Sequence, residues 1–364
     1  MSIVRFFAGI FLFSLFLPAT LPAQEEVNLG FLIPDRHTLA ARHGAELAVQ
    51  EANRRGGCCG KKFHLIVRSV EGPWGTGSKQ AVSMIFDYEV MAIAASLDGR
   101  NAHLAEQITT KTKVAFLSAW STDMTLSYAF VPWYFRCIPD DKQQAKVLIN
   151  EVYRKKKIRN VVLIGEDNYD AENAIATFLK MSSNSHLPAP RQVTVRSTPE
   201  KELVLTAAMI PEAGAYILFG TPALASSFMK VYREKGLTGP VFGTLSLLDD
   251  RQAHTQDWSV LQDVTVVAPA LSATPEAKEF KEKFLKKYGY EPGPAAAYAY
   301  DGINVIIEAI RKTGTNRNRI IGYLSGIRYR GVTGLIRFDE KGNRAGEATL
   351  MIIRDGHPVP CPTQ

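Results

Sequence analysis

The chain repeats one pattern, an apolar run of strand length followed by a segment whose apolar residues recur at helical spacing. The first example is VNLGFLI at residues 27–33, followed by apolar residues that share one helical face from Ala41 to Ala52. Gly56 then provides a helix stop. Because parallel strands need a crossover connection, which is usually a helix, the alternation predicts an α/β fold with parallel sheets.

The repeats form two series. A single hydrophobic core stops growing at roughly 250–300 residues, and the chain has 364 residues. We therefore predict two doubly wound lobes, with the second series starting after Pro139–Asp141. Further expected strands of the first series are residues 62–70, 91–96 and 114–119. After Asp141, the expected strands include residues 160–166, 215–221, 334–339 and 348–354.

Residues 1–23 have the makeup of a secretory signal peptide. Arg5 precedes an apolar run from Phe6 to Leu17, and cleavage is expected after Ala23. The alternative, a membrane anchor, is disfavoured because the run is shorter than the ~20 residues that span a bilayer. We expect a periplasmic mature chain with no stable membrane insertion.

The formal net charge is +7 at pH 7. Its densest basic run, at residues 154–159, falls at the end of an expected helix, where cations favour the helix dipole and stay solvated. No basic motif interleaved with aromatic residues is present, so we expect no nucleic-acid partner.

The four cysteines are Cys58, Cys59, Cys137 and Cys361. They are consistent with an oxidising compartment and allow three complete disulfide pairings, which the sequence leaves open. A bond between the neighbours Cys58 and Cys59 would be strained, which favours a distant partner if either is oxidised. No CxxC pair occurs, so no metal site is expected.

Motifs for catalysis and for cofactor binding are missing. No GxGxxG follows the first strand, and the glycine-rich segment at residues 72–79 has Ser78 where a phosphate-binding loop needs lysine. Neither GxSxG nor HExxH occurs. We therefore expect no cofactor and no catalytic residues; a secreted hydrolase is the least supported alternative.

Ligands of open parallel sheets bind beyond the carboxyl ends of the strands. The segments that follow the expected strands are rich in hydroxyl, carboxylate and aromatic groups, which suit a small polar or zwitterionic ligand. These segments are residues 34–37, 96–100, 118–123, 166–169, 221–222 and 244–246.

Five segments resemble the type I periplasmic solute-binding proteins of ABC importers, of the leucine/isoleucine/valine-binding type. They are residues 44–57 (GAELAVQEANRRGG), 116–127, 134–141 (YFRCIPDD), 297–310 (AYAYDGINVIIEAI) and 329–344. The resemblance runs through nearly the whole mature chain in the family's order.

This resemblance implies two lobes joined by a three-crossover hinge, with a small ligand bound between them and an ABC permease as partner. Carried over by order, the first lobe combines residues 24–140 with 270–325. The second combines residues 141–269 with 326–364. Closure would then accompany binding, because the ligand touches both lobes only in the shut cleft.

On the first lobe, the resemblance assigns a ligand carboxylate to the segment that contains Ala119, Trp120 and Ser121. Backbone N–H groups and the Ser121 hydroxyl would hold it, although Ser121 also fits an N-cap. Trp120 is expected either to stack on an aromatic ligand or to fill the lobe interface.

After the third strand the family commonly has a small hydroxyl residue, and this chain offers Ser96 and then Asp98 and Arg100. Asp98 suits a ligand cation, and Arg100 suits a further carboxylate. A mutual surface ion pair between Asp98 and Arg100 is the alternative.

On the second lobe, Tyr169 resembles the aromatic residue that closes over the ligand, although a half-buried tyrosine at a helix start is common. Thr221 and Ser246 are expected to face the cleft. An acid that often engages the ligand's amino group in the family appears only at Asp249.

The sequence thus predicts a non-enzymatic, periplasmic protein that captures a small carboxylate-bearing ligand for an ABC importer. An amino acid and an organic or aromatic acid are the candidate ligands. The alternative is a sensing module that signals to a separate receptor.

Overall fold

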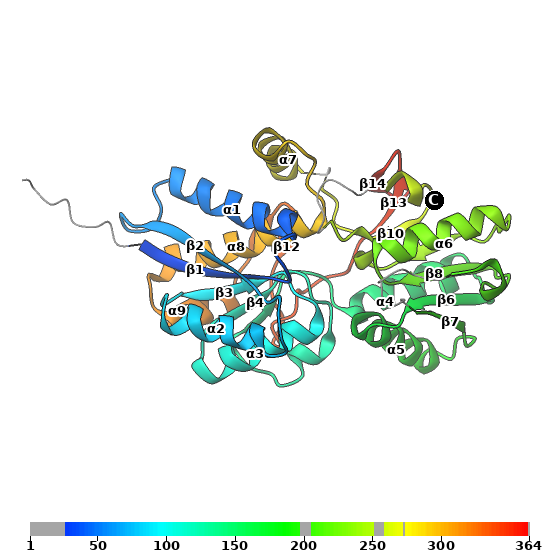
Figure 1. The fold of residues 1–364 in the computed structure, drawn as a ribbon, viewed down its shortest axis with the longest axis horizontal. Coiled ribbons are helices and arrows are strands. Elements are labelled where there is room, and N and C mark those ends of the chain that lie inside the picture. The colour runs from blue at the N-terminus through cyan, green and yellow to red at the C-terminus, as the bar shows by residue number, and fades with distance from the viewer. Residues whose placement is uncertain (1–25, 197–204, 251–257, 272–273, 363–364) are drawn as a thin grey trace, which may run out of the picture.

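The structure, a computed structural model, describes residues 26–196, 205–250, 258–271 and 274–362. Two α/β lobes lie side by side along the long axis of the molecule (Figure 1). The signal peptide predicted at residues 1–23 lies outside the described residues. None of the helices in the described part of the chain has the length and apolar character that a membrane crossing requires.

The first lobe is built on a five-stranded parallel sheet. Its strands are β1 (Glu26–Ile33), β2 (Lys62–Ser69), β3 (Ala92–Ala95), β4 (Ala115–Ser118) and β5 (Tyr134–Arg136). They lie in the order β2-β1-β3-β4-β5, and every neighbouring pair is parallel. β3 and β4 are buried along their whole length, as strands are when helices cover both faces of a sheet.

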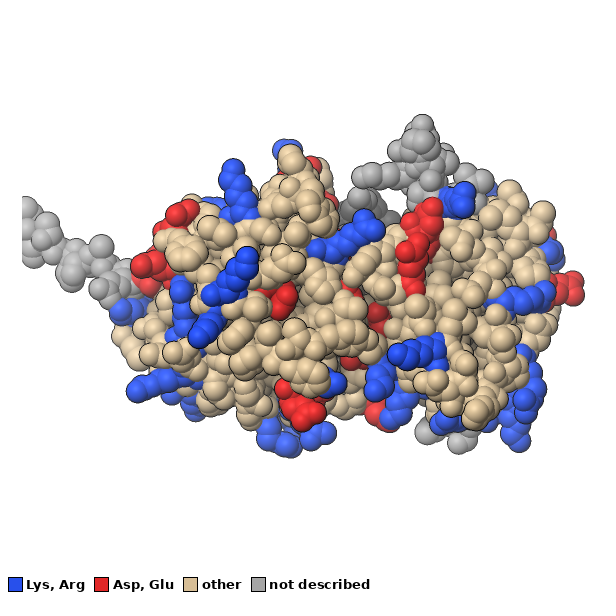
Figure 2. All heavy atoms as spheres, turned by 90° about the horizontal axis from the view of Figure 1, so that it is seen from below, with Lys and Arg blue, Asp and Glu red and all other residues tan. Residues whose placement is uncertain are grey.

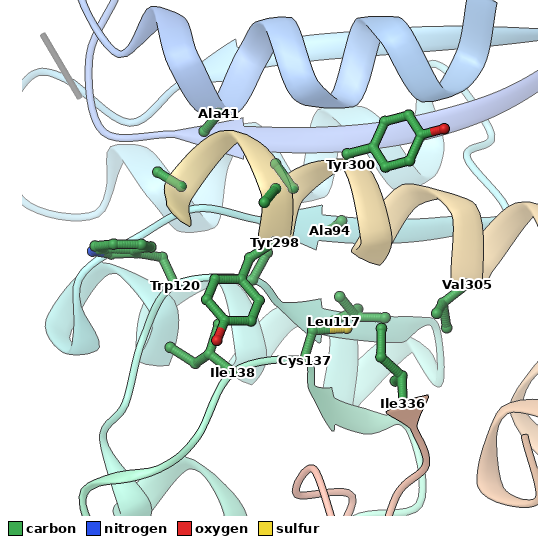
Figure 3. Close-up of a cluster of buried hydrophobic side chains, with 14 of the residues drawn as sticks. Ala41, Ala94, Leu117, Trp120, Cys137, Ile138, Tyr298, Tyr300, Val305 and Ile336 are labelled. Carbon is green, nitrogen blue, oxygen red and sulfur yellow. The ribbon is translucent and has the colours of Figure 1, made fainter. Parts of the chain in front are cut away.

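The helices of the first lobe come from two distant parts of the chain. They are α1 (Leu39–Arg54), α2 (Thr76–Phe86), α3 (Gly99–Thr112), α7 (Pro275–Tyr288), α8 (Pro294–Thr313) and α9 (Arg317–Ser325), with a 3₁₀ turn η1 (Met124–Ser127). α8 is buried almost all round. Its contact with α1 needs Gly44, because a Cβ there would lie 2.1 Å from the carbonyl oxygen of Ala296. Figure 3 shows side chains of β4 and α8 in this core, with Trp120 at its edge.

The second lobe has a seven-stranded mixed sheet. Its strands are β6 (Val161–Glu166), β7 (Arg191–Val195), β8 (Ala215–Phe219), β9 (Val241–Gly243), β10 (Thr265–Val267), β13 (Leu350–Arg354) and β14 (His357–Pro360). The order is β14-β13-β10-β9-β8-β6-β7. β6 to β10 pair in parallel, whereas β13 is antiparallel to both β10 and β14. The predicted parallel sheet therefore carries an antiparallel hairpin at one edge.

Three α-helices and several short helical turns complete the described part of the second lobe. They are α4 (Asp141–Ile149), which continues into a π-helical turn η2 (Asn150–Lys155), α5 (Tyr169–Asn184), α6 (Pro222–Glu234), and the 3₁₀ turns η3 (Ala207–Met209), η4 (Leu245–Leu248) and η5 (Trp258–Leu261). α4 starts sharply because Asp140 and Gln143 cap it reciprocally, each side chain accepting a hydrogen bond from the other's backbone N–H.

The chain passes between the lobes three times, which confirms the predicted three-crossover architecture. The crossings lie between β5 and α4, between β10 and α7, and between the last hairpin of the first lobe and β13. In Figure 1 these connections meet in the middle of the molecule.

That hairpin, β11 (Tyr329–Gly331) with β12 (Gly334–Ile336), packs on the first lobe. The Asp301 carboxylate on α8 accepts hydrogen bonds from the backbone N–H groups of Val332, at 2.9 Å, and Thr333, at 2.8 Å. The boundary predicted at residue 325 therefore comes too early. The buried Asp301 carboxylate needs these donors, so the hairpin stays on α8 of the first lobe. The chain joins the sheet of the second lobe only at Leu350.

All four cysteines are free thiols in the structure. The Sγ atoms of Cys58 and Cys59 lie 3.6 Å apart, at van der Waals contact, and Cys137 is fully buried. The favoured distant pairing of Cys58 or Cys59 is therefore not found. Burial raises the pKa of the Cys137 thiol, which keeps it unreactive.

Candidate ligand-binding cleft

A cavity of about 440 Å³ lies between the lobes, where the carboxyl ends of strands from both sheets and the first turns of α3, α4 and α5 converge. Its volume is within the range of small-molecule sites. The first lobe contributes Asp98, Arg100, Trp120 and Thr122 to its wall. The second lobe contributes Asp141 and Gln144 on α4, residues 167–172 and Ala174 around the start of α5, residues 219–221 after β8, and residues 244–246 and Asp249 after β9.

Six of the nine residues predicted for the site line this cavity. They are Asp98, Arg100, Trp120, Tyr169, Thr221 and Ser246. They come together because each follows a strand or opens a helix, as the topology of an open α/β sheet requires.

The other three predicted residues, Ser96, Ala119 and Ser121, lie buried behind the wall. The backbone N–H of Ser96 donates to the Leu32 carbonyl, and that of Ala119 donates to the Ala95 carbonyl at 2.8 Å. The Ser121 Oγ accepts a long hydrogen bond, 3.4 Å, from the Asp123 N–H. The bonds of Ser96 and Ala119 thus hold strand ends of the first sheet, that of Ser121 holds the loop after β4, and none of the three residues lines the cavity.

Asp98 acts as the N-cap of α3. Its carboxylate accepts hydrogen bonds from the Asn101 backbone N–H at 3.0 Å and from the Asn101 side-chain amide at 2.7 Å. Arg100 lies over the ring of Tyr169, with its guanidinium carbon 5.2 Å from the ring centre. This arrangement takes the place of the predicted alternative, an ion pair between Asp98 and Arg100.

The lobes touch across the mouth of the cavity. The Gly99 N–H at the start of α3 donates to the Asp170 carboxylate on α5, at 3.0 Å. The Tyr169 hydroxyl on α5 donates to the Asp123 carboxylate of the first lobe, also at 3.0 Å. The structure is therefore of a closed form, in which α5 of one lobe is bonded to the α3 region of the other.

Asp123 accepts the Tyr169 hydrogen bond as one of several that favour its ionised form. Its carboxylate also pairs with His103 Nε2 at 3.1 Å and accepts hydrogen bonds from the N–H and hydroxyl of Thr125. Burial alone would raise the pKa of Asp123, but hydrogen bonds from His103, Thr125 and Tyr169 outweigh it and lower the pKa to about 2.

The floor on the second lobe is fixed by buried polar pairs. The Glu166 carboxylate accepts hydrogen bonds from the N–H and the hydroxyl of Thr221 and from the Asn168 amide. Gln144 Oε1 accepts the Leu245 N–H at 2.9 Å. The Thr221 hydroxyl is thus committed to Glu166, which holds the loop after β8 in shape.

The wall also contains residues that the sequence analysis did not single out. Asp141 and Gln144 open α4 directly after the first crossover, and Asp170 follows the predicted Tyr169. Asp141 is 4% exposed. Burial raises its pKa well above the usual range for an aspartate, although a hydrogen bond with Thr122 and the nearby Arg136 act in the opposite direction. The sequence feature that could have indicated Asp141 as a cavity residue is the segment PDD at residues 139–141.

Comparison with known proteins agrees with this geometry. A family model described as periplasmic binding protein matches residues 37–355. The chain belongs to this family.

Relatives within the periplasmic binding protein family include Leu/Ile/Val-binding protein homolog 7 of Brucella abortus, 24% identical over 317 residues that cover 80% of this chain and 78% of that protein. The structure of the branched-chain amino acid transporter substrate-binding protein LivJ from Streptococcus pneumoniae, in complex with isoleucine, matches with a TM-score of 0.79 and 21% identity. That match covers 92% of this chain and 98% of LivJ.

A solute-binding protein of an ABC transporter from Rhodopseudomonas palustris, in complex with 3,4-dihydroxybenzoic acid, matches with a TM-score of 0.76 and 21% identity. It covers 92% of this chain and 95% of that one. These matches confirm the resemblance to the leucine/isoleucine/valine-binding type and the predicted fold class. Membership of the family implies a periplasmic location and a ligand-binding role.

Proposed function

We propose that this chain is a periplasmic solute-binding protein that captures a small carboxylate-bearing molecule in the cleft between its lobes and delivers it to an ABC importer. The observation that carries the proposal is the interlobe cavity, which has Arg100 on one wall and polar loop ends on the other. Arg100 is the residue that would receive the ligand carboxylate, since its guanidinium matches a carboxylate in geometry and charge.

The wall suits a molecule with an apolar body and polar ends. Trp120 provides aromatic surface, and Thr244 and Ser246 provide hydroxyl groups that bond to each other at 2.8 Å. No covalent step is proposed, in keeping with relatives that are solute-binding proteins. The family resemblance further supports an ABC permease as the partner of the closed form.

The test is a ligand screen. Differential scanning fluorimetry of the purified mature chain against amino acids and organic and aromatic acids, followed by calorimetry of the hits, should find a ligand that raises the melting temperature. Mass spectrometry of any small molecule that copurifies gives an independent answer. Absence of binding by every acid and amino acid tested, with a folded protein, would refute the proposal.

A further inference from the structure

Two adjacent cysteines occupy the turn between α1 and β2. The backbones of Cys58 and Lys61 exchange two hydrogen bonds across this turn, each 2.9 Å long. The φ angle is +53° at Cys59 and +80° at Gly60, and positive φ at both central residues is typical of a type I′ turn. Cysteine therefore stands at a turn position that usually goes to glycine, asparagine or aspartate.

The turn brings the two thiols together and gives them unlike exposure. The Sγ atoms of Cys58 and Cys59 lie 3.6 Å apart, although side chains of adjacent residues in a strand point to opposite faces. Cys59 is exposed, whereas Cys58 is 6% exposed and its Sγ lies 3.8 Å from the Ile310 carbonyl oxygen on α8. A reagent in solvent can thus reach Cys59, and Cys58 can reach Cys59 from the protein side.

Cations surround the pair. The exposed Arg55 and Lys62 flank it along the chain, and Arg311 on α8 donates to the carbonyl oxygen of the residue before Cys58, at 3.0 Å. Burial and the neighbouring Cys59 raise the pKa of the Cys58 thiol, and Arg311 acts in the opposite direction. Nearby cations favour thiolates and attract anionic reagents.

This turn is remote from the ligand cavity. It precedes the first residue of β2, whereas the cavity lies beyond the carboxyl ends of the strands. In Figure 1 the connection from α1 to β2 is at the end of the first lobe that faces away from the second lobe. Chemistry at the turn is therefore separate from ligand capture.

We propose that Cys58 and Cys59 form a thiol–disulfide exchange site, in which Cys59 reacts with an external disulfide and Cys58 resolves the product into a reversible bond between the two neighbours. The oxidant is a molecule that carries a reactive disulfide, as an oxidising compartment supplies. Resolution by Cys58 keeps the exposed Cys59 from remaining joined to another molecule.

The exchange proceeds in two steps. The Cys59 thiolate attacks one sulfur of the external disulfide, which forms a mixed disulfide and releases the first thiol. The Cys58 thiolate then attacks the Cys59 Sγ, which releases the second thiol. The two cysteines lose two electrons and two protons in total, and the external disulfide takes them up as it becomes two thiols.

The bond formed is expected to be easy to reduce. Neighbouring Cα atoms are about 3.8 Å apart, whereas ordinary disulfides join Cα atoms about 4.4–6.8 Å apart. The bond between Cys58 and Cys59 is therefore strained, and strained disulfides are the labile ones. An excess of thiol should return the pair to the reduced form.

The experiment uses the mature chain with Cys361→Ala, because Cys361 is the other exposed cysteine. After treatment with glutathione disulfide, mass spectrometry of the intact chain should show the loss of two hydrogen atoms and no glutathione adduct. Peptide mapping should place the new bond between Cys58 and Cys59. Excess reduced glutathione should then restore the original mass.

Two further variants in the same background separate the roles of the thiols. Cys58→Ser should accumulate a glutathione adduct at Cys59, because the resolving thiol is missing. Cys59→Ser should stay unmodified, because Cys58 is buried. If Cys58→Ser fails to fold, the mapping of the Cys361→Ala chain decides alone.

Three outcomes would overturn the proposal. They are a lasting glutathione adduct at Cys59 in the Cys361→Ala chain, no reaction of that chain, and a bond that excess glutathione leaves intact. Oxidation should leave ligand affinity unchanged, since the turn is remote from the cavity. A failed ligand screen would refute the proposed function without touching the exchange site, so the two proposals are tested separately.

Discussion

The two lobes present unlike faces to the cleft. The first-lobe face combines the cation Arg100 with Trp120, and its carboxylate Asp98 is used to cap α3. The second-lobe face carries the other five lining carboxylates, which are Asp141, Asp167, Asp170, Glu172 and Asp249. The face of the molecule seen in Figure 2 shows no such division, because Lys and Arg side chains are spread over both lobes there.

This difference assigns a separate task to each lobe. The first-lobe face presents one cation and an aromatic side chain, which suit the ligand carboxylate and apolar body of the proposed function, and the second-lobe face presents mainly carboxylates and hydroxyl groups. Closure also brings Asp170 of the second lobe onto the N-terminus of α3 in the first. A negative charge there is favoured by the helix dipole, so the acidic face helps to hold the lobes together.

The largest expected effect comes from the aromatic side chain of the first-lobe face. Trp120 is 7% exposed, lines the cavity and belongs to the core cluster of its lobe. Trp120→Ala should lower the free energy of unfolding by about 3 kcal/mol, since it leaves a large void, and should abolish ligand binding. Denaturant unfolding with calorimetry measures both quantities.

Trp120→Phe is the control and should retain most of the stability. An unchanged free energy of unfolding in Trp120→Ala would show that the side chain belongs to the ligand site alone and not to the core.

Arg100 tests the charge of the first-lobe face directly. Arg100→Ala should weaken binding of an amino acid ligand about 30-fold, or about 2 kcal/mol, because the ligand carboxylate loses its cationic partner. The melting temperature of the ligand-free protein should change little. Lys111→Ala, an exposed cation at the other end of the same helix, is the matched control and should bind normally.

Equal losses of ligand affinity in Arg100→Ala and Lys111→Ala would mean that α3 affects binding only through its net positive charge. The assignment of the ligand carboxylate to Arg100 on the first-lobe face would then fail.

Acid should weaken the protein through Asp123. Its pKa is lowered from 3.8 to about 2 in the folded chain, so the unfolded state binds more protons between these values. The stabilisation is fully present above pH 3.8 and is lost as the pH falls through 2, by at most about 2 kcal/mol. Urea unfolding of the wild type and of Asp123→Asn between pH 5 and pH 2.5 measures the difference.

The difference in free energy of unfolding between the wild type and Asp123→Asn should become smaller as the pH falls. Asp87→Asn, an exposed aspartate at the end of α2, is the control and should follow the wild type throughout. A constant gap between the wild type and Asp123→Asn would show that the ionised carboxylate contributes nothing to the folded state.

Much of the fold was predictable from the sequence because long apolar runs and helical spacing determine element type locally. The predicted runs at residues 27–33 and 160–166 match β1 and β6. The three-residue strand β5 and the edge strand β14 were missed, since segments so short or so rich in proline carry little periodic signal. The place of the β11–β12 hairpin depends on its long-range bonds to Asp301, which no local pattern reveals.

The site was predicted as a set of loops more accurately than as a set of side chains. Position after a strand brought Asp98, Tyr169 and Thr221 to the cavity. Position after a strand does not show whether a side chain points toward the cavity or toward the core. The sequence analysis therefore predicted the buried Ser121 as a site residue and did not predict Asp141, which lines the cavity. Whether a loop residue faces the wall or the core depends on hydrogen bonds within the loop, which the sequence does not show.

Tyr169 and Ser121 give the smallest expected effects and the sharpest contrast between a residue in the wall and one behind it. Tyr169→Phe removes the hydrogen bond to Asp123 that joins the lobes, while the ring stays beneath Arg100. Because one net hydrogen bond contributes about 1 kcal/mol, ligand binding should weaken about fivefold through easier opening of the cleft.

Ser121→Ala should leave ligand binding unchanged. The Ser121 Oγ accepts a hydrogen bond from the Asp123 N–H, and the residue is only 2% exposed. Calorimetry of both variants, with small-angle scattering to follow opening, makes the comparison. A loss of affinity in Ser121→Ala equal to that in Tyr169→Phe would show that the loop after β4 turns its hydroxyl to the ligand when the cleft is filled. In that case the anion site on the first lobe would be larger than Arg100 alone, and the division of charge between the two faces would be weaker than the closed form indicates.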